Sequence, residues 1–444
     1  MLPIFKEYKQ MLFENGVDLS EYDDDKLWID RMIIKGFDKS GKEKKICRLK
    51  VVGDYDNLKY EVINYYKTKT KNKQKIKTID KPLNNTLETY SETYERMKTS
   101  IAAKEKDSLD CIRTKLNIYL KKGYKVILPT SMGKDSKLTE YLLQRVSNEY
   151  KAVFNNTTLD SSDVYKEVKD RPEIEIVTPV DKDGKNLSFY NLMKSWGTPN
   201  RFYRWCCSIF KEGATIQRFK NEKNILFVFG MRNEESANRS NYGTLYRNPQ
   251  WTDKTWVGLL PIRKWSELEL WLYTLKNNIP INIKYKKGYG RVGCNIACPF
   301  YTSSTWILDK YWYPLAYDRY HNFIEKDFIS NEKWCRINCT KNEYHLNWNG
   351  GLVRKEPNED VINEFMEYKG FNDKSLAHQY FSKKCSSCNK NVYKKDEIAM
   401  NLKLFGRNIN TFTCGRCLRK KLDWSESQWN EEVSLFKKQG CSLF

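Results

Sequence analysis

Six residues in the first third of the chain have the types and spacing of a phosphate-binding loop. Ser131-Met-Gly-Lys-Asp-Ser136 lies between a predicted strand, KVILPTS, and a predicted helix, KLTEYLLQRV. Glycine permits a tight turn, after which backbone N–H groups and the positive end of the helix attract an anion. Ser131 and Ser136 offer hydroxyl groups, Lys134 offers a positive charge, and Asp135 either orders the loop or holds Mg²⁺. The spacings of a Walker A loop and of a dinucleotide-binding loop are both absent, so a phosphate site of another kind is predicted.

Strand-like and helical segments alternate after this loop. The short apolar runs YKAVFNN, IEIVTPV and NILFVFGM are separated by helical patterns such as SSDVYKEVKD. This alternation is typical of a parallel sheet covered by helices. A helix is predicted before the loop, over residues 86–122, because apolar residues recur there at three- and four-residue steps. We therefore expect an α/β domain over residues 86–300 and an aromatic-rich helical extension over residues 301–380.

Residues 1–85 are predicted to form a small accessory domain. KLWIDRMIIKGF and KKICRLKVV are β-prone and are joined by the turn-like DKSGKE, so a hairpin is expected. Lysine then occupies every second position from Lys67 to Lys77. On a strand this spacing places six ammonium groups on one face, which suits a phosphate backbone. The alternative is a solvated edge strand or loop.

The charge of the chain bears on its partners. Its 444 residues include 78 lysines and arginines against 56 acidic residues, a formal charge of +22. This surplus favours polyanionic partners, nucleic acid first, although a lysine-rich low-GC coding sequence gives the same composition. No apolar run approaches the roughly 18 residues of a membrane helix, and the first residues do not resemble a secretory signal. We therefore expect a cytoplasmic protein without a membrane partner.

The loop resembles the SxGKDS form of the PP-loop that is found in PAPS reductases, ATP sulfurylase small subunits and related enzymes. Four downstream segments resemble the same family in the same order, so that the resemblance covers about residues 120–300. These segments are FNNTTLDSSDVYKEV (154–168), RWCCSIFK (204–211), FGMRNEESANRS (229–240) and the tryptophan-rich stretch 261–294, which ends in Gly-Cys. The resemblance implies the parallel-sheet fold of the adenine nucleotide alpha hydrolase-like PP-loop ATP pyrophosphatases.

The resemblance also implies a site for ATP or an adenylyl-sulfate-type nucleotide, with Mg²⁺. Its residues would be Ser131, Gly133, Lys134, Asp135 and Ser136 in the loop, completed by Arg232, Glu235, Ser236 and Arg239. Lys134, Asp135, Arg232 and Arg239 would be the catalytic residues. Guanidinium groups suit phosphate or sulfate oxygens and stabilise the charge that develops during transfer. The alternative for Arg239 is a surface ion pair with Glu235, one helical turn away.

Most of the 13 cysteines are clustered, which in a reducing compartment indicates metal or redox chemistry more often than disulfides. Some members of the resembled family hold a [4Fe–4S] cluster on an adjacent cysteine pair and a later close pair. Here the corresponding residues are Cys206, Cys207, Cys294 and Cys298, although the later pair is spaced CxxxC in place of CxxC. Cys335 and Cys339 are rival ligands, and an alternative set is Cys207, Cys294, Cys298 and Cys339. Zinc or buried core thiols are the remaining interpretations.

The last segment, residues 381–444, contains two CxxC pairs, Cys385–Cys388 and Cys414–Cys417. The pairs are separated by 25 residues and lie in turn-like sequence, an order typical of a structural Zn²⁺ site with four thiolates. Such an ion stabilises a segment that is too small for its own apolar core. Redox chemistry at a CxxC pair is the alternative. Lysines and arginines crowd this module, so contact with nucleic acid is a further hypothesis.

Three functions are compatible with these features. The first is an ATP-dependent enzyme that activates an acceptor, preferably nucleic acid, for sulfur transfer from a cysteine desulfurase-type partner by way of the cluster. The second is a PAPS or adenylyl-sulfate reductase that releases sulfite with thioredoxin-type electrons. The Glu-Cys-Gly-x-His segment of such reductases is absent, and Cys441 lacks its flanking residues. The third is a nucleotide-sensing, DNA-binding regulator without turnover. His321, His345 and His378 are scattered, so a histidine-based site is not expected.

Overall fold

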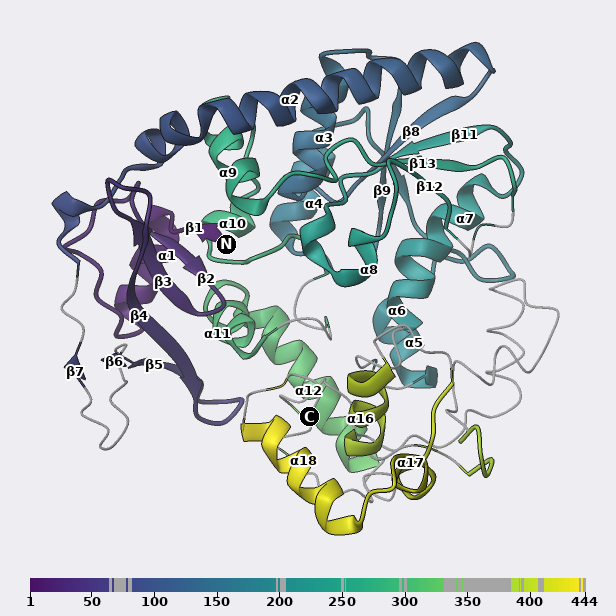
Figure 1. The fold of residues 1–444 in the computed structure, drawn as a ribbon. Coiled ribbons are helices and arrows are strands. Elements are labelled where there is room, and N and C mark those ends of the chain that lie inside the picture. Colours follow the sequence, from purple (N-terminus) through teal and green to yellow (C-terminus); the bar gives the residue numbers. More distant parts are fainter. Residues whose placement is uncertain are drawn as a thin grey trace. The chain divides into compact units, whose positions relative to one another are not determined.

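The computed structural model describes most of the chain as two compact units (Figure 1). The first unit contains Met1–Thr178, Ala214–Ile296 and Thr302–Pro314, and the second contains Pro179–Gly213, Ala297–Tyr301 and Leu315–Phe444. The structure describes all residues except 64–65, 68–76, 79–81, 197–198, 200–204, 249–250, 252, 295–297, 299–301, 331–340, 342–344, 346–384, 391, 393–394, 406–410, 439–440 and 442–444.

The first unit begins with a five-stranded antiparallel sheet in the order β1-β2-β3-β4-β5. Its elements are β1 (Leu2–Pro3), α1 (Lys6–Glu14), β2 (Trp28–Asp30), β3 (Ile33–Phe37), β4 (Glu43–Val52) and β5 (Lys59–Ile63). β3 and β4 form the predicted hairpin. Its turn is closed by Asp38, whose carboxylate accepts hydrogen bonds from the N–H groups of Ser40 (2.9 Å) and Lys42 (3.0 Å).

The lysine stripe follows β5. Its two ends lie in the short strands β6 (Tyr66–Lys67) and β7 (Lys77–Thr78), which pair with each other in antiparallel fashion. The side chains of the stripe lie outside the described residues. Its proposed contact with a phosphate backbone therefore stays a prediction.

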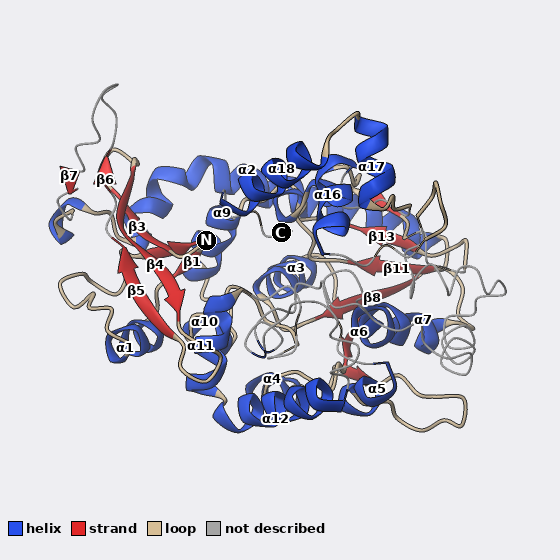
Figure 2. Ribbon diagram, turned by 90° about the horizontal axis from the view of Figure 1, so that it is seen from below, coloured by secondary structure: helices blue, strands red, loops and turns tan. Residues whose placement is uncertain are grey.

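A six-stranded sheet in the order β10-β9-β8-β11-β13-β12 forms the α/β part of the first unit (Figure 2). Its strands are β8 (Lys125–Thr130), β9 (Lys151–Asn155), β10 (Glu175–Val177), β11 (Ile225–Val228), β12 (Leu245–Tyr246) and β13 (Val257–Leu259). All pairs are parallel except β12–β13, which confirms the predicted parallel sheet. The strand order reverses at β8, because β9 lies on one side of it and β11 on the other. In open parallel sheets, ligands bind at the carboxyl ends of the strands beside such a reversal.

The remaining helices of the first unit lie before, between or after these strands in the chain. They are α2 (Tyr90–Lys121), α3 (Lys134–Gln144), α4 (Ser162–Lys169), α7 (Ala214–Phe219), α8 (Ala237–Ser240), α9 (Glu267–Lys276), α10 (Ile283–Lys286) and α11 (Ser303–Trp312). The long helix α2 packs against α3 and α9. It begins four residues later than predicted, because residues 84–86 form a 3₁₀ turn and a reciprocal pair of bonds between Thr89 and Glu92 caps the α-helix.

The antiparallel sheet and the α/β layer share one hydrophobic core, which runs from Leu2 to Leu308. At their junction the ring of Phe5 meets that of Trp271 edge-on, with centroids 6.2 Å apart. The indole N–H of Trp271 donates to the carbonyl of Met1 (3.0 Å). The first strands therefore support the helix α9 that covers the phosphate loop. The sequence-based division into domains at residues 85, 300 and 380 stays a prediction.

The second unit is helical where it is described. It contains α5 (Phe189–Trp196), α6 (Trp205–Cys207) with a π-helical turn at Ser208–Gly213, α12 (Pro314–Ser330), α16 (Lys395–Phe405), α17 (Gly415–Leu422) and α18 (Glu426–Lys438). Within the described part of the chain, every helix is too short or too polar to cross a membrane.

The packing of α2 on α9 gives a test of the fold. Ser108 is buried, donates to the carbonyl of Pro261 (3.0 Å) and accepts from the indole N–H of Trp265 (2.9 Å). We expect Ser108→Ala to lower the free energy of unfolding by about 1–3 kcal/mol, because both buried partners lose their hydrogen bond. Thr114→Ala, an exposed control on the same helix, is expected to change it by less than about 0.5 kcal/mol. Denaturant unfolding measures both. Equal effects would show that the Ser108 bonds do not stabilise this packing.

Candidate functional site

The predicted phosphate loop connects the carboxyl end of β8 to the first turn of α3. Met132 takes the left-handed conformation of the turn (φ 58°), whereas Gly133 is extended (φ −83°, ψ 164°) and caps α3. The N–H of Met132 donates to the hydroxyl of Thr130 (3.2 Å), and Ser136 donates to the carbonyl of Gly133 (2.9 Å). The loop is thus braced from both ends, and the N-terminal amides of α3 lie at the edge of the sheet.

Gly133 does not supply a left-handed turn, but the space beside its Cα is narrow. A Cβ on Gly133 would lie 3.2 Å from the hydroxyl of Tyr285 and 3.2 Å from the Oγ of Ser131. The Tyr285 hydroxyl accepts a hydrogen bond from the N–H of Lys134 (2.9 Å). The Tyr285 hydroxyl therefore already accepts a hydrogen bond from one N-terminal amide of α3, and amides of this kind bind anions.

Lys134, Asp135 and Arg232 form a buried ionic network beneath the loop. One carboxylate oxygen of Asp135 lies 2.9 Å from the Nζ of Lys134, and the other lies 2.6 Å from the Nε of Arg232. Glu267 lies 3.4 Å from the Nζ of Lys134, and Glu234 lies 2.9 Å from the Nη1 of Arg232. Lys134 and Arg232 are 7% and 3% exposed, so water screens these charges little.

The protonation states of the network follow from its charges. Burial alone raises the pKa of Asp135, but the charges of Lys134 and Arg232 outweigh it, and the pKa is lowered. Burial alone lowers the pKa of Lys134, and the charge of Asp135 more than offsets this, so that the pKa is raised. All three groups are therefore ionised at neutral pH. A magnesium ion on Asp135 would have to replace one of its two cations.

Arg232 reaches this network because β11 ends directly against α3. A Cβ on Gly230 would lie 2.5 Å from the carbonyl oxygen of Asp135 and 2.9 Å from the backbone nitrogen of Ser136. Backbone atoms cannot move aside as a flexible side chain can. Gly230 is therefore the residue that lets the end of β11 approach the phosphate loop.

The rest of the predicted signature lies beside Arg232. Glu235 accepts from the backbone N–H of Arg232 (2.9 Å) and pairs with Arg239, while the Oγ of Ser236 accepts from the N–H of Arg239 (3.3 Å). The ion pair considered from the sequence is thus present, with Arg239 38% exposed. The structure brings together the loop and Arg232. The roles assigned to Glu235, Ser236 and Arg239 at the nucleotide stay predictions.

Sequence reasoning missed Tyr285, Glu267 and Lys284. The first two contact Lys134, as described above. Lys284 is fully buried, with its Nζ 3.4 Å from the carbonyl of Gly293 and 4.5 Å from the centre of the Tyr289 ring. Burial lowers the pKa of Lys284, opposed by the charge of Asp309. All three missed residues lie in the stretch 261–294, which was recognised only as a segment.

The turn after β9 lies at the same edge of the sheet. The side-chain oxygen of Asn156 accepts from the N–H of Thr158 (2.9 Å) and from the hydroxyl of Tyr165 (2.7 Å). Thr158 is left-handed (φ 58°). This turn provides a second braced loop beside the phosphate loop, as parallel strands of one sheet require.

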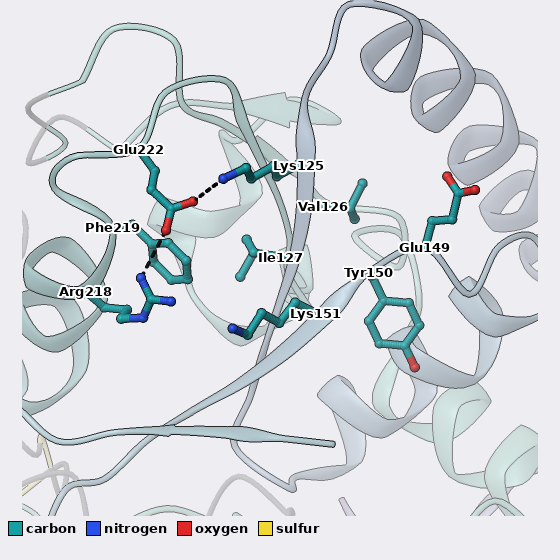
Figure 3. Close-up of a pocket in the computed structure, with 9 residues that line it drawn as sticks. All are labelled: Lys125, Val126, Ile127, Glu149, Tyr150, Lys151, Arg218, Phe219 and Glu222. Carbon is teal, nitrogen blue, oxygen red and sulfur yellow. Dashed lines mark hydrogen bonds and ion pairs between the residues drawn. The ribbon is translucent and has the colours of Figure 1, made fainter. Parts of the chain in front are cut away.

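A separate hollow of about 370 Å³ lies at the amino ends of β8 and β9 (Figure 3). Its basic groups are paired with acids: Lys125 with Glu222 (2.8 Å) and Arg218 also with Glu222 (3.0 Å). Because the hollow lies at the opposite edge of the sheet from the loop, we do not assign it to the nucleotide.

The two CxxC pairs of the second unit form one cluster. The sulfur atoms of Cys385, Cys388, Cys414 and Cys417 all lie within 4.8 Å of one another. Cys388 and Cys414 lie 3.7 Å apart, and the N–H of Cys414 donates to the sulfur of Cys385 (3.2 Å). This is the only group of three or more potential ligands among the described residues. Four converging sulfur donors fit a tetrahedral metal ion.

The thiol pKa values favour a bound cation. Burial raises the pKa of Cys385, but backbone N–H groups of Cys414, Ser387 and Cys388 outweigh it and lower the pKa to about 6. Hydrogen bonds with Cys414 and Cys388 raise the pKa of Cys417 to about 12. Ionisation of one thiol thus makes ionisation of the next one less favourable. A divalent cation bound to the sulfur atoms would offset this repulsion between thiolates.

The structure leaves the second cysteine group as a prediction. Cys294 lies in the first compact unit, and Cys206, Cys207 and Cys298 lie in the second. Cys206 and Cys207 directly precede a π-helical turn, which is often found near functional sites. Cys335 and Cys339 lie outside the described residues.

Two histidines expected to be scattered lie together in the second unit. The Nδ1 atoms of His321 and His345 are 2.8 Å apart, and the Nε2 of His345 lies 3.0 Å from a carboxylate oxygen of Glu325. Both histidines are buried. The two residues are 24 positions apart, so the sequence did not indicate their contact, and the expectation that they form no histidine-based site stays a prediction. His378 lies outside the described residues.

Comparison with known proteins agrees with this geometry. Residues 125–299, which contain β8 to β13 and the loop, match the family described as the phosphoadenosine phosphosulfate reductase domain. Residues 125–299 therefore contain a PAPS reductase-like domain. Its parallel sheet and braced loop are therefore a PAPS reductase-like core, to which the antiparallel sheet and the four-cysteine cluster are added.

The most similar relatives differ in how much they match. An uncharacterized protein of Methanocaldococcus jannaschii is 26% identical over 63% of this chain and 67% of its own length. A second one is 31% identical over 47% of this chain, but the match spans only 43% of that relative. An adenosine 5'-phosphosulfate reductase of Shouchella clausii is 24% identical over 45% of this chain and 80% of its length.

Similarity to solved structures is weaker. A PAPS reductase of Candida auris in complex with phosphate matches 44% of this chain and 93% of that chain at 14% identity, with a TM-score of 0.33. An FMN adenylyltransferase of Candida glabrata matches 44% of this chain and 63% of that chain at 15% identity, with a TM-score of 0.30.

The close approach of Gly230 to the loop gives a second test. Gly230→Ala is expected to lower the free energy of unfolding by about 2–3 kcal/mol and to weaken nucleotide binding, because the new Cβ displaces the backbone at Asp135. Gly290→Ala is the matched control, since a Cβ there meets nothing within 4 Å. Thermal melting with and without ATP measures both effects. A stable Gly230→Ala variant that binds ATP as the wild type does would contradict the packing argument.

The four-cysteine cluster gives a third test. Elemental analysis of the anaerobically purified full chain is expected to find one metal ion that depends on the cluster. Cys385→Ser should lose it, whereas Cys111→Ser, at a half-buried single cysteine on α2, should retain it. Acidification should release the ion, because the ligands must be thiolates. Retention of the metal by Cys385→Ser would exclude this site.

Proposed function

We propose that this chain binds the phosphate groups of an adenine nucleotide at residues 131–136 and uses ATP to activate an acceptor for sulfur transfer. The observation that carries the proposal is the buried network of Lys134, Asp135 and Arg232 at the carboxyl end of β8. It holds two cations beside the N-terminus of α3, where an anion gains from both the helix amides and the fixed charges. The PAPS reductase-like domain at residues 125–299 supports a nucleotide as that anion.

The residues have separate roles in this proposal. The N-terminal amides of α3 bind phosphate oxygens, and Tyr285 gives up the N–H of Lys134 to the nucleotide. Lys134 and Arg232 stabilise negative charge that develops on the phosphates, while Asp135 holds both cations in place before the nucleotide arrives. Because the cations are already fixed, little reorganisation is needed when the charge develops.

The activation step is a nucleotidyl transfer. An acceptor oxygen attacks the α-phosphorus of ATP, the new O–P bond forms, and the bond between that phosphorus and the α,β-bridging oxygen breaks. Pyrophosphate leaves with the electron pair of the broken bond, and the attacking hydroxyl releases its proton to solvent. The acceptor then carries an adenylate, which a sulfur nucleophile can displace. Mg²⁺ would neutralise the β- and γ-phosphates during this step.

The metal and partner assignments belong to the same proposal. The four-cysteine cluster holds Zn²⁺ as a structural ion, as its all-sulfur donor set favours. As the family resemblance implies, a [4Fe–4S] cluster would be held by Cys206, Cys207, Cys294 and Cys298, or by the alternative set Cys207, Cys294, Cys298 and Cys339, and would supply a soft site for sulfur or electrons. Nucleic acid is the preferred acceptor because of the +22 charge, and a cysteine desulfurase is the sulfur donor.

A second candidate is a reductase that releases sulfite from PAPS or adenylyl sulfate, with electrons from a thioredoxin-type partner. It is favoured by the similarity to the adenosine 5'-phosphosulfate reductase of Shouchella clausii over 80% of that enzyme. The missing Glu-Cys-Gly-x-His segment argues against it.

Product analysis separates the two candidates. Anaerobic protein with ATP and mixed nucleic acid is expected to release pyrophosphate, whereas PAPS or adenylyl sulfate with reduced thioredoxin should yield no sulfite. Arg232→Gln is expected to lower pyrophosphate release at least about 100-fold, since a fixed cation at the developing charge is lost. Arg113→Gln, an exposed arginine on α2, is the control. Sulfite release would favour the reductase. ATP binding without pyrophosphate or sulfite release would favour the nucleotide-sensing regulator without turnover.

A further inference from the structure

The helix α17, which begins within the second CxxC pair, carries positive charges without acidic partners among the described residues. Arg416, Lys420 and Lys421 are exposed and have no ion-pair partner among the described residues. Arg416 and Lys420 are four residues apart and lie on the same face of the helix. Arg419 is different, because it is half-buried and lies 3.8 Å from Glu426. We call Arg416, Lys420 and Lys421 the α17 basic face.

The helix α17 is fixed to the module at two places. Cys414 and Cys417 belong to the four-sulfur cluster, at the first turn of the helix. One residue later, Leu418 is fully buried in a small core with Met400, Trp429 and Val433. The cluster and this core therefore hold the orientation of α17. Arg416 lies two residues before Leu418 and so on the other side of the helix, whereas Lys421 is exposed at the edge of the fixed side.

The segment that leads into α17 is also fixed. The side chain of Asn401 on α16 donates to the carbonyl of Thr413 (2.7 Å) and accepts from its N–H (2.9 Å). The carboxylate of Glu397 accepts from the N–H of Gly415 (2.8 Å) at the start of α17. A helix fixed at its start, at its cluster and at its core loses little further entropy when its charged face binds a partner.

We propose that the α17 basic face binds the phosphate backbone of a nucleic acid. Exposed cations without acidic partners gain most from a polyanion, because binding releases the counterions condensed on it. Arginine and lysine on one helical face match a row of phosphates without reading its sequence. This inference rests on the proposed function, in which nucleic acid is the acceptor. It adds that the acceptor binds to a surface of the four-cysteine module.

Neither charge compensation at the sulfur cluster nor a membrane surface fits the basic face as well. Cations could offset the negative charge of four thiolates around one divalent ion, but Arg416 and Lys420 are exposed, and water and salt screen an exposed charge from the sulfur atoms. An anionic membrane surface would select large apolar side chains among the cations. The basic face itself contains none, and the leucines of α17 are buried or half-buried.

The test is the salt dependence of nucleic-acid binding by the metal-loaded full chain. Fluorescence anisotropy with a labelled duplex of about 20 base pairs, a single-stranded DNA and a single-stranded RNA gives the affinity between about 50 and 300 mM salt. Arg416→Gln/Lys420→Gln is expected to weaken duplex binding at least about 10-fold at about 100 mM salt. It should also reduce the steepness of log K against log salt by about 2, since each phosphate contact contributes about 0.9 on a duplex.

Matched variants separate this contact from general charge. Lys121→Gln/Lys122→Gln removes the same charge from the exposed end of α2 in the first unit and should leave the slope unchanged. Arg416→Lys keeps the charge and should keep the slope. Metal content, measured on each protein, shows whether the module remains folded. If Arg416→Gln/Lys420→Gln loses its metal, the single variant Lys421→Gln is used, with an expected slope change of about 1.

Several results would overturn the proposal. They are an unchanged slope in the metal-loaded basic-face variants, no binding of the wild type to any of the three nucleic acids, and binding only to phosphatidylserine vesicles. Pyrophosphate release from ATP by the wild type is measured in parallel, with nucleic acid in excess. Release by the wild type together with an unchanged slope in the variants identifies a failed surface, whereas nucleic-acid binding by the wild type without release identifies a failure of the proposed function.

Discussion

The buried carboxylate of Asp135 holds together two parts of the chain that are 97 residues apart. It receives Lys134 from its own loop and Arg232 from the end of β11, inside a region where charges are poorly screened. Removing any one of the three would leave an uncompensated buried charge, which is strongly destabilising. The same arrangement keeps two cations near the N-terminus of α3 before any anion binds. Structural stability and readiness for a nucleotide therefore depend on one set of contacts.

Other parts of the first unit make the contact between Asp135 and Arg232 possible or support the elements around it. Gly230 allows β11 to lie against the first turn of α3, and without that approach Arg232 would not reach Asp135. The antiparallel sheet packs its first residues on Trp271 of α9, and Glu267 at the start of α9 borders Lys134. The N-terminal strands are therefore part of the support of the loop through a shared core.

The second unit uses a different source of order. Its C-terminal module has two small cores, around Phe412 and around Trp429, and a cluster of four sulfur atoms beside the first. Cores of this size bury too little apolar surface to offset the entropy of ordering the chain, and a metal ion on the four sulfur atoms would supply the difference. A rigid module of this kind presents short helices in a fixed orientation. The fixed orientation would let the exposed charges of α17 bind a partner with little loss of entropy.

The sequence determined the local elements and the local motifs. The apolar runs of β8, β9 and β11 are short and bounded, and the SMGKDS loop lies between a strand and a helix, so periodicity and turn chemistry were sufficient. The CxxC spacing likewise predicted that four sulfur atoms would meet. Tertiary structure alone decided which distant side chains complete each site. Tyr285 and Glu267 reach Lys134 from a distant part of the chain, His321 meets His345 across 24 residues, and the left-handed position fell on Met132 and not on Gly133. Such contacts depend on how whole elements pack. The residues next to each member of a pair in the sequence do not indicate which distant residue it contacts.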